Sequence, residues 1–351
     1  MAVFVMMLPS DPASTVATSS RVAFPPAARS PTSHVPVPGS YVPWPGVALV
    51  RVIPAGSGSL TKTGSGRLTL GNTQAGFAGS GTINAGTLAL PSGTLDWDVD
   101  GAGDLAKVGG GQLNVLGNVS NTGAINIEGG TLQVGNVGTA GSIGNPSSIS
   151  LSDGLALRYR LSGADATLDS SAVTFAANNS QLRQHSGTAD GKLTITNTTI
   201  GGTTTDANGS AVQGIMSSEG GNLVFGSGTS AAVREVYLRN GIATIEDGAD
   251  LKVRYFNIGN GGGTSGIVNQ TGGNVTMEAG SAGIRIGHWS GGGRQYNLSG
   301  GTLDATGLAA NGGDARYVMM GWDGEGDMTV GGGPGAATLK AAGLKFDRGR
   351  S

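Results

Sequence analysis

The chain has 351 residues, of which 66 are glycine and none is cysteine, so disulfides, thiol catalysis and thiolate metal sites are excluded. Its 21 basic and 23 acidic residues give a net charge of −2, which offers no electrostatic reason to bind nucleic acid or an anionic membrane. Charged residues make up only 13% of the chain and aromatic residues 5%. Core-forming residues spread so thinly favour a narrow stacked core over a thick globular one.

Residues 1–54 differ in composition from the rest of the chain. Ten of the 13 prolines fall there, and such a Pro/Ser/Ala-rich segment predicts a disordered leader. Its apolar start, Ala2 to Leu8, lacks the basic residues that open a signal peptide, so a functional signal and a non-native leader both stay open. Val47 to Ile53 is a candidate first strand. No run approaches the roughly 18 apolar residues of a membrane helix.

Residues 55–351 are built from short alternating segments, and the clearest of these lies between Gly56 and Leu90. Alternation bounded by glycine and asparagine indicates strands separated by tight turns. Glycine costs about 1 kcal/mol relative to alanine inside a helix, so no helix is expected there. We expect Lys62 and Arg67 to be solvated. The predicted core residues of this stretch are Leu60, Leu68, Leu70, Ile83, Leu88 and Leu90.

The pattern of this stretch returns 45 residues later. At that shift Gly56, Gly58, Leu60, Lys62, Gly64, Gly66, Leu68 and Leu70 align with Gly101, Gly103, Leu105, Lys107, Gly109, Gly111, Leu113 and Val115. The run INAGTLAL at Ile83 returns as IEGGTLQV at Ile127, 44 residues later. Loops tolerate the loss of a residue far better than strands do. We therefore interpret 44–45 residues as two turns of a stacked structure.

Two runs carry a resemblance to a known family. They are G-x-G-x-L-x-K-x-G-x-G-x-L-x-L at Gly56 to Leu70 and T-I-N-A-G-T-L-x-L at Thr82 to Leu90, which includes Gly86, Leu88 and Leu90. The chain resembles the autotransporter passenger-associated β-strand repeat, specifically over Gly56 to Leu90 and more loosely over Gly101 to Val134. The resemblance implies a right-handed parallel β-helix, a solenoid, on a bacterial cell surface. It implies no catalytic residues.

An acidic run follows the first repeat and is a candidate calcium site. Its residues are Asp96, Asp98, Asp100 and Asp104, and with Gly101 they match the first half of a D-x-D-x-D-G calcium loop. Lys107 stands where that loop needs a bidentate glutamate. The acidic residues alternate with Leu95, Trp97 and Val99, so in a strand their carboxylates would stand about 6.6 Å apart. We favour a solvated outer face over a metal site.

A second repeat family begins at Ile258 with a shift of 28 residues. Ile258, Gly259, Asn269, Gly272, Gly273 and Val275 align with Ile286, Gly287, Asn297, Gly300, Gly301 and Leu303, and a weaker third copy starts at Met320. Asn269 and Asn297 occupy equivalent places. We expect these two side chains to stack as an internal asparagine ladder, which stabilises parallel strands.

Aromatic residues near these repeats are candidates for contact with a glycan. Trp289 and Trp322 each follow an Ile-Gly or Met-Gly pair closely, and Tyr296 lies nearby in the sequence. Flat rings on one side of stacked turns could hold a sugar, whereas the alternative is that they cover turn edges. The histidines are isolated, so zinc is not expected. The sequence predicts no catalytic residue, metal site or cofactor.

Three functions fit these patterns. The first is a non-catalytic, surface-exposed or secreted passenger of the adhesin kind. The second is a glycan-binding or structural stalk. The third is a polysaccharide lyase or hydrolase, because many such enzymes use parallel β-helices, and its best cluster would be Asp247, Asp250 and Arg254. Turnover of polyuronates would separate the third function from the others.

The expected location is extracellular, on a bacterial cell surface or outer membrane. The expected partners are a cell-surface glycan or a host or matrix protein, without nucleic acid. An uncapped last turn would expose an unpaired edge and favour end-to-end self-association. No stretch after Leu303 has the pattern of a membrane translocator. We expect an incomplete passenger, either continued beyond Ser351 in the native gene or exported and anchored by a separate protein.

Overall fold

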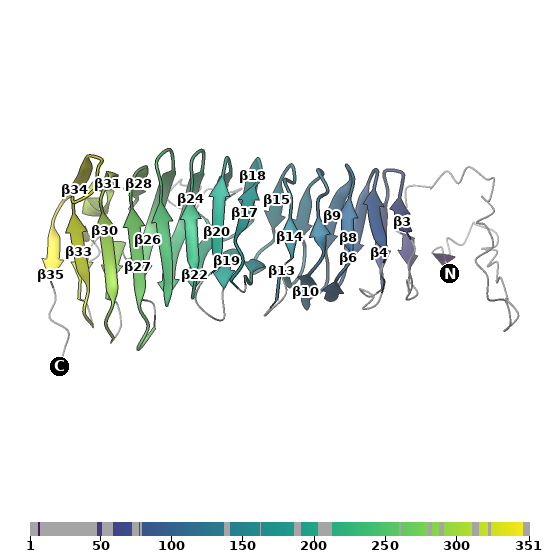
Figure 1. The fold of residues 1–351 in the computed structure, drawn as a ribbon, viewed down its shortest axis with the longest axis horizontal. Coiled ribbons are helices and arrows are strands. Elements are labelled where there is room, and N and C mark those ends of the chain that lie inside the picture. Colours follow the sequence, from purple (N-terminus) through teal and green to yellow (C-terminus); the bar gives the residue numbers. More distant parts are fainter. Residues whose placement is uncertain are drawn as a thin grey trace, which may run out of the picture.

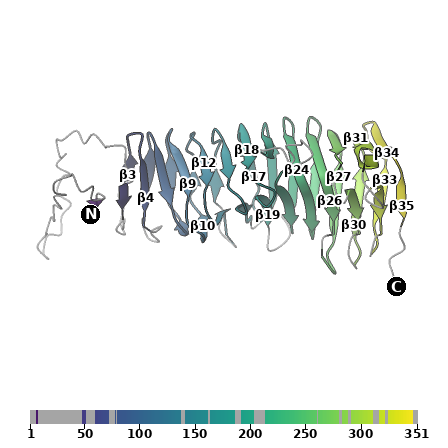
Figure 2. The ribbon, with the colours of Figure 1, turned by 180° about the vertical axis from the view of Figure 1, so that it is seen from behind.

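The computed structural model describes residues 6–7, 48–50, 59–71, 77, 79–136, 141–161, 163–185, 191–202, 213–259, 261–279, 283–287, 291–310, 316–321 and 324–346. Within these ranges the chain is all-β, with short strands and one 3-10 helix, η1 (Thr306–Ala310). The strands stack side by side into an elongated rod (Figure 1), which Figure 2 shows from behind. The all-β class predicted from the sequence is confirmed.

The strands of the first ladder pair in parallel along the rod. They are β2 (Ala48–Val50), β4 (Arg67–Leu70), β6 (Thr87–Leu90), β9 (Asp104–Lys107), β12 (Ile125–Ile127), β15 (Ile149–Leu151), β18 (Ala172–Phe175), β21 (Thr199–Gly202), the first halves of β24 (Ser230–Arg239) and β26 (Asp250–Ile258), β28 (Asn274–Met277), β31 (Gly301–Ala305) and β34 (Ala337–Ala341).

The second ladder is also parallel, and the long strands β24 and β26 join it to the first. It contains β7 (Gly93–Leu95), β10 (Gln112–Val115), β13 (Thr131–Val134), β16 (Ala156–Tyr159), β19 (Gln181–His185), β22 (Ile215–Glu219), the second halves of β24 and β26, β29 (Gly283–Ile286), β32 (Val318–Met320) and β35 (Leu344–Phe346).

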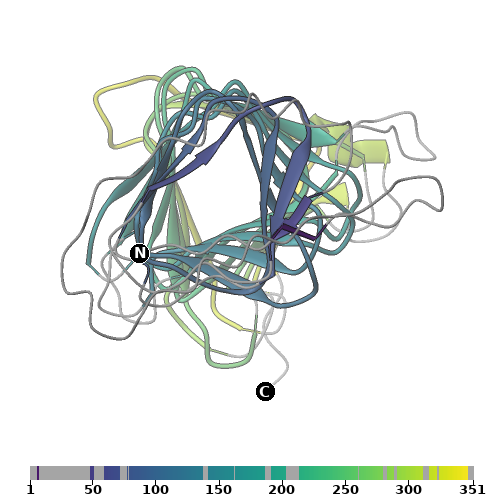
Figure 3. The same ribbon diagram turned by 90° about the vertical axis from the view of Figure 1, so that its right-hand side faces the viewer.

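The third ladder consists of two parallel sheets. The first sheet contains β3 (Ser59–Lys62), β5 (Ser80–Ile83), β8 (Asp98–Asp100), β11 (Asn118–Val119) and β14 (Ser142–Ile143). The second contains β17 (Ala166–Asp169), β20 (Lys192–Thr196), β23 (Asn222–Phe225), β25 (Gly241–Ile245), β27 (Gly266–Gln270), β30 (Arg294–Leu298) and β33 (Asp327–Val330). Viewed along the rod, the strands surround one interior (Figure 3).

The core lies inside this ring because side chains alternate between the interior and the solvent along each strand. Leu88 and Leu90 in β6 are buried, as are Leu60, Leu70 and Ile83 from the same predicted core set. Leu68 is only partly buried and packs against the core. The alternation therefore predicted the buried residues of this stretch correctly except for Leu68, which is less buried than expected. Gly56 and Gly58 lie outside the described residues.

The spacing of the turns differs from the prediction of two turns per 45 residues. Leu60 pairs with Gly81 in the third ladder, whereas Leu105 pairs with Leu88 and Ile125 in the first. A turn here takes about 20 residues, as the pairing of Leu105 with Ile125 requires. The repeat therefore spans two turns plus one further face, and its copies lie at neighbouring corners of the rod.

The 28-residue repeat has the predicted register. Ile258 pairs with Ile286, which in turn pairs with Met320 in the third copy. Asn269 pairs with Asn297, and the Asn297 side-chain amide donates a hydrogen bond of 3.0 Å to Asn269 Oδ1. Both side chains are only half-buried, between inward-facing neighbours. The asparagine ladder is thus confirmed, but it lies on the outer face and not inside.

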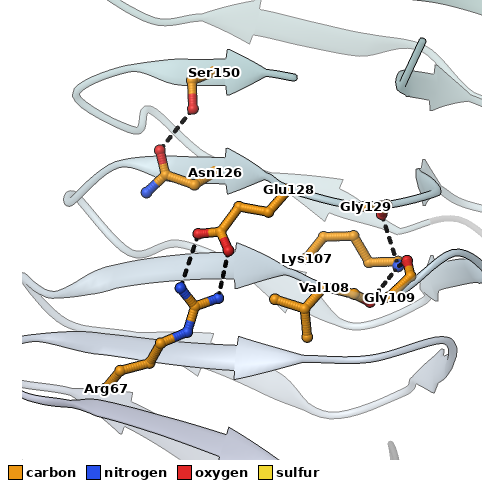
Figure 4. A network of polar contacts seen from close by, with 8 residues as sticks. All are labelled: Arg67, Lys107, Val108, Gly109, Asn126, Glu128, Gly129 and Ser150. Carbon is orange, nitrogen blue, oxygen red and sulfur yellow. Dashed lines mark hydrogen bonds and ion pairs between the residues drawn. The ribbon is translucent and has the colours of Figure 1, made fainter. Parts of the chain in front are cut away.

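The prediction that Lys62 is solvated is wrong. Its side chain shares the inward phase of Leu60, and the residue is 7% exposed. The ammonium group donates hydrogen bonds to the carbonyls of Thr63 at 2.9 Å, Gly64 at 2.6 Å and Ala85 at 2.9 Å. Lys107 does the same at the next corner, towards Val108 at 2.7 Å, Gly109 at 2.8 Å and Gly129 at 2.9 Å (Figure 4). The repeat lysine satisfies carbonyls that a tight corner leaves unpaired.

The other predicted solvated residue, Arg67, forms a surface ion pair. Its guanidinium binds Glu128 through two bonds, of 3.0 Å and 2.7 Å (Figure 4). Arg67 lies in β4 and Glu128 follows β12, so the pair spans the two intervening strands, β6 and β9. The outward residues of those strands, Ala89 and Ala106, are fully covered. These small side chains leave room for the Arg67 and Glu128 side chains to meet above β6 and β9.

Only two short parts of the predicted leader are described. β1 (Met6–Met7) pairs antiparallel with β2, and β2 falls inside the candidate first strand Val47 to Ile53. The rest of the leader, including the residues of the predicted disorder, lies outside the described residues. In the described ranges no helix has the length and apolar character needed to cross a bilayer.

Candidate functional site

The acidic run at Asp96 to Asp100 faces solvent, as its alternation predicted. Leu95, Trp97 and Val99 are buried, and the three aspartates between them are exposed. No group of three or more potential metal ligands occurs within the described ranges. Two of the acidic side chains bind backbone instead: Asp98 accepts from the amide of Asn118 at 2.8 Å, and Asp104 accepts from that of Ala124 at 2.8 Å.

The predicted aromatic contacts are not brought together on a described surface. Tyr296 is fully buried in β30, and its hydroxyl donates a hydrogen bond of 2.7 Å to Gln270 Oε1. Burial raises the pKa of this phenol. The proposal that its ring contacts a glycan is therefore wrong. Trp289 and Trp322 follow the paired strands β29 and β32, but both lie outside the described residues.

The cluster considered for a lyase is spread along one turn and one strand. Asp247 and Asp250 are exposed, at the turn before β26 and at its first residue. Arg254 is half-buried, four residues further along the strand. A rise of about 3.3 Å per residue separates the backbones of Asp250 and Arg254 by roughly 13 Å. This arrangement does not form a compact acid–base site.

A different set of side chains gathers on the outer face of the second ladder. One outward position on each strand is polar from β10 to β29 and follows the ladder in register: Asn114, Gln133, Arg158, Arg183, Ser217, Tyr237, Asn257 and Arg285. The corresponding row of the first ladder is mostly small: Ala89, Ala106, Asn126, Ser150, Thr174 and Gly201. We name the second-ladder set the polar row.

Two arginines on adjacent strands form the centre of the polar row. Arg158 in β16 pairs in register with Arg183 in β19. Arg158 Nη1 makes two long contacts of 3.5 Å, with the side-chain oxygens of Gln112 and Gln133. Its Nε is buried without a hydrogen-bond partner. Burial, and then the charge of Arg183, lowers the pKa of Arg158.

An acidic residue, Glu219, lies at the end of β22 beside this pair. Tyr237 donates a hydrogen bond of 2.8 Å to Glu219 Oε1, and Arg183 Nη1 lies 3.5 Å from the same oxygen. His185 Nδ1 lies 3.3 Å from Oε2. The contact with His185 is the main cause that lowers the pKa of Glu219 to about 2, and Tyr237 and Arg183 act in the same direction against burial. This carboxylate is therefore ionised at neutral pH.

The chemistry open to the cluster follows from these contacts. Both oxygens of Glu219 are occupied, and burial raises the pKa of Tyr237, which keeps its phenol protonated. Neither group is placed to take a proton from a substrate, because the base of such a step must reach the proton it removes. Arg158 has no carboxylate among its contacts. The arrangement can bind an anion.

Glu219→Gln tests the ionised state of this carboxylate. Because the folded-state pKa is below the usual value near 4.3, the unfolded chain takes up the proton first as pH falls. We expect the stability difference between the wild type and Glu219→Gln to be constant above about pH 4.3 and to shrink as pH falls to about 2. Urea unfolding measured across this range gives the profile. Glu246→Gln, in an exposed turn, is the matched control, and identical profiles for both variants would contradict the assignment.

Sequence reasoning missed this cluster, although part of its signal was present. Arg158 alternates with Leu157 and Tyr159, which predicts an outward position, and Arg183 lies between Leu182 and Gln184 in the same way. The sequence does not show which residues of adjacent strands pair with each other. Paired residues are 25 positions apart from Leu157 to Leu182 but 34 apart from Leu182 to Met216, because the connections between strands vary in length.

Comparison with known proteins finds no family model, no curated protein and no solved structure that matches this chain.

Proposed function

We propose that this chain folds as a right-handed parallel β-helix and acts as a non-catalytic passenger of the autotransporter type, adhesin-like and exposed on the surface or secreted. The observation that carries the proposal is the recurrence of three parallel ladders in the same order along one rod. Such a rod presents long side-chain rows to a partner, as solenoids do. The autotransporter class rests on the resemblance of the runs at Gly56 to Leu70 and Thr82 to Leu90.

Binding is favoured over catalysis by the state of the charged groups on the second ladder. Glu219 is held ionised by three neighbours, and Tyr237 is one of them. A lyase acting on a polyuronate needs a base free to remove the proton next to the carboxylate. A glycan-binding stalk and an adhesin differ only in the ligand that the rod binds. The argument for binding over catalysis therefore supports both functions equally.

The last turn supports the proposed end-to-end self-association. The exposed large hydrophobic residues of the described ranges all lie there: Val330 at 47%, Leu344 at 44% and Phe346 at 73% exposure. Val330 belongs to β33, and Leu344 and Phe346 belong to β35; these are the final described strands of their ladders. Exposed apolar side chains of this kind favour contact with a second copy.

The proposed function is tested by adhesion and turnover measured on the same preparation. The purified full chain, immobilised on beads, is applied to a glycan array and to a layer of host matrix protein. In parallel it is incubated with polygalacturonate and alginate, and unsaturated and reducing ends are followed. We expect retention on at least one surface without new chain ends. Cleavage of either polymer would contradict a non-catalytic passenger.

A further inference from the structure

We propose that Arg158 and Arg183, at the centre of the polar row, bind the acid groups of a linear acidic polysaccharide that lies along the rod. This inference rests on the proposed adhesin function and names its ligand class. The two arginines lie on the adjacent strands β16 and β19 of the second ladder, and Gln112 in β10 and Gln133 in β13 contact Arg158 through their amide oxygens.

The spacing of the site suits a repeating ligand. Neighbouring strands lie about 4.8 Å apart, and the polar row offers one side chain per strand. Gln133, Arg158 and Arg183 are direct register partners, so they form a line perpendicular to the strands. A polymer aligned with the rod would pass half-exposed members of the row on either side of the two arginines, such as Asn114 and Tyr237, whereas Gln133 and Ser217 are covered. A compact ligand would contact the arginine pair alone.

The charge of the site calls for an anion. Within the described ranges the hydrogen bonds of Arg158 are two long ones to uncharged amide oxygens, and Arg183 shares Glu219 with His185 and Tyr237. Arg160 lies two residues from Arg158 and adds a further positive charge, which also lowers the pKa of Arg158. The region therefore holds several cations around one carboxylate. An acid group placed between Arg158 and Arg183 would relieve their repulsion and form charge-assisted hydrogen bonds.

The neighbouring amides are already oriented towards Arg158. Gln112 donates a hydrogen bond of 2.6 Å to Asn114 Oδ1, and Gln133 donates one of 3.0 Å to the same oxygen. Gln133 also donates to the carbonyl of Gly135 at 3.0 Å. These bonds fix the two amide nitrogens, so that both amide oxygens face Arg158. Arg183 is held similarly, because its Nε donates to Gln181 Oε1. A preorganised site loses little entropy on binding.

A polysaccharide fits these residues better than a nucleic acid, although both are linear polyanions. Proteins that bind single strands place aromatic rings beside their arginines for base stacking. The aromatic member of the polar row, Tyr237, lies two strands beyond Arg183 and is bound to Glu219 through its hydroxyl. Nucleic-acid-binding domains are also commonly basic, whereas this chain has a pI near 5.9. The half-exposed amides in β10, Gln112 and Asn114, lie near Arg158 instead, and amides suit sugar hydroxyls.

The test compares binding by the wild-type full chain with binding by Arg158→Gln/Arg183→Gln. The matched control is Lys192→Gln/Lys252→Gln, which removes the same charge from the third and first ladders. The probes are oligogalacturonate for carboxylates, a heparin oligosaccharide for sulfates, neutral dextran and single-stranded oligothymidylate. Affinities are measured by calorimetry at about 0.15 M salt, where exposed charges are screened beyond about 8 Å.

We expect one or both acidic oligosaccharides to bind the wild type and the control within about twofold. The arginine double variant should bind at least about tenfold more weakly, since each charge-assisted hydrogen bond is worth more than a neutral one. Dextran should not bind. If the arginine double variant loses affinity for oligogalacturonate alone, the ligand carries carboxylates. If it loses affinity for the heparin oligosaccharide alone, the ligand carries sulfates. Thermal unfolding of each variant establishes that it folds, and Arg158→Lys/Arg183→Lys should give an intermediate loss because lysine lacks the bidentate geometry.

Several outcomes overturn the inference. They are equal weakening in both double variants, unchanged affinity in the arginine variant, no binding of either acidic oligosaccharide, or tighter binding of the oligothymidylate. Retention of the arginine variant on the glycan array would reject this site and leave the adhesin function standing. Cleavage of the oligogalacturonate would reject the non-catalytic function whatever the arginine variants show.

Discussion

Replacing Gly130 by alanine is expected to lower the free energy of unfolding by more than about 4 kcal/mol, a size that points to steric overlap in the backbone. Gly130 has φ of +65°, in the left-handed region that residues with a Cβ disfavour. An added Cβ would also overlap the carbonyl oxygen of Gly111, which lies on the preceding turn. Neither strand can move aside without breaking the pairing of β10 with β13. Urea unfolding followed by circular dichroism measures the loss.

Two neighbouring glycines separate the causes of this effect. Gly109 also has a positive φ, of +72°, but an added Cβ would meet nothing within 4 Å, so Gly109→Ala should cost only about 1–2 kcal/mol. Gly110 has open space and no positive φ, so Gly110→Ala should change stability by less than about 1 kcal/mol. If all three substitutions cost the same, close packing of corners would not be the reason for the repeat glycines.

The glycines explain why the 45-residue repeat exists although its copies do not stack on each other. Gly86 is the equivalent of Gly130 in the first copy, with φ of +71°, and a Cβ there would overlap the carbonyl oxygen of Gly66. In each copy the longer motif forms one corner and the shorter motif stacks on it. The repeated unit is therefore a pair of stacked corners. It serves the corner between the third and first ladders, and then the one between the first and second.

The sequence predicted the parts of the fold that depend on local patterns. Alternation identified strands and most inward side chains, such as Leu88 and Leu90, because one face of each strand must be buried. Copies of constant length, 28 residues apart, gave the correct register for Asn269 and Asn297. The sequence could not predict the register where connections change length, and for that reason the Arg158–Arg183 pair was not found. Tyr296 was misplaced because it was chosen for its nearness in sequence to the tryptophans, although it has the inward phase of β30 and Gln270 accepts its hydroxyl inside.

The buried lysines show a second limit of the sequence analysis. Lys62 follows Leu60 by two residues and so shares its inward phase, yet its charge was taken as a sign of solvation. The side chain nevertheless points inward, because the strand ends at a corner whose carbonyls accept no other hydrogen bond among the described residues. At Lys107 burial lowers the pKa, while three carbonyl acceptors favour the ammonium form. A lysine in core phase just before Gly-x-Gly therefore indicates a corner.

Lys107→Met tests whether this lysine holds its corner together, and we expect it to lower the free energy of unfolding by about 3 kcal/mol. Methionine fills a similar volume but donates no hydrogen bond, so the carbonyls of Val108, Gly109 and Gly129 would lose their shared donor. The bond to Gly129 joins adjacent turns, and its loss should also loosen the pairing of β9 with β12. Urea unfolding gives the free energy, and amide hydrogen exchange at Glu128, whose backbone N–H binds the Lys107 carbonyl, reports the corner itself.

The matched control for Lys107→Met is Lys252→Met, on the exposed outer face of β26. It removes the same charge and adds the same side chain, but it should change stability by no more than about 0.5 kcal/mol. Lys62→Met should resemble Lys107→Met, because its ammonium binds three carbonyls in the same way. An unchanged unfolding curve for Lys107→Met, or an equal loss in Lys252→Met, would show that the carbonyls find water or another donor. The hydrogen bonds of the repeat lysine would then not be needed to stabilise the corner.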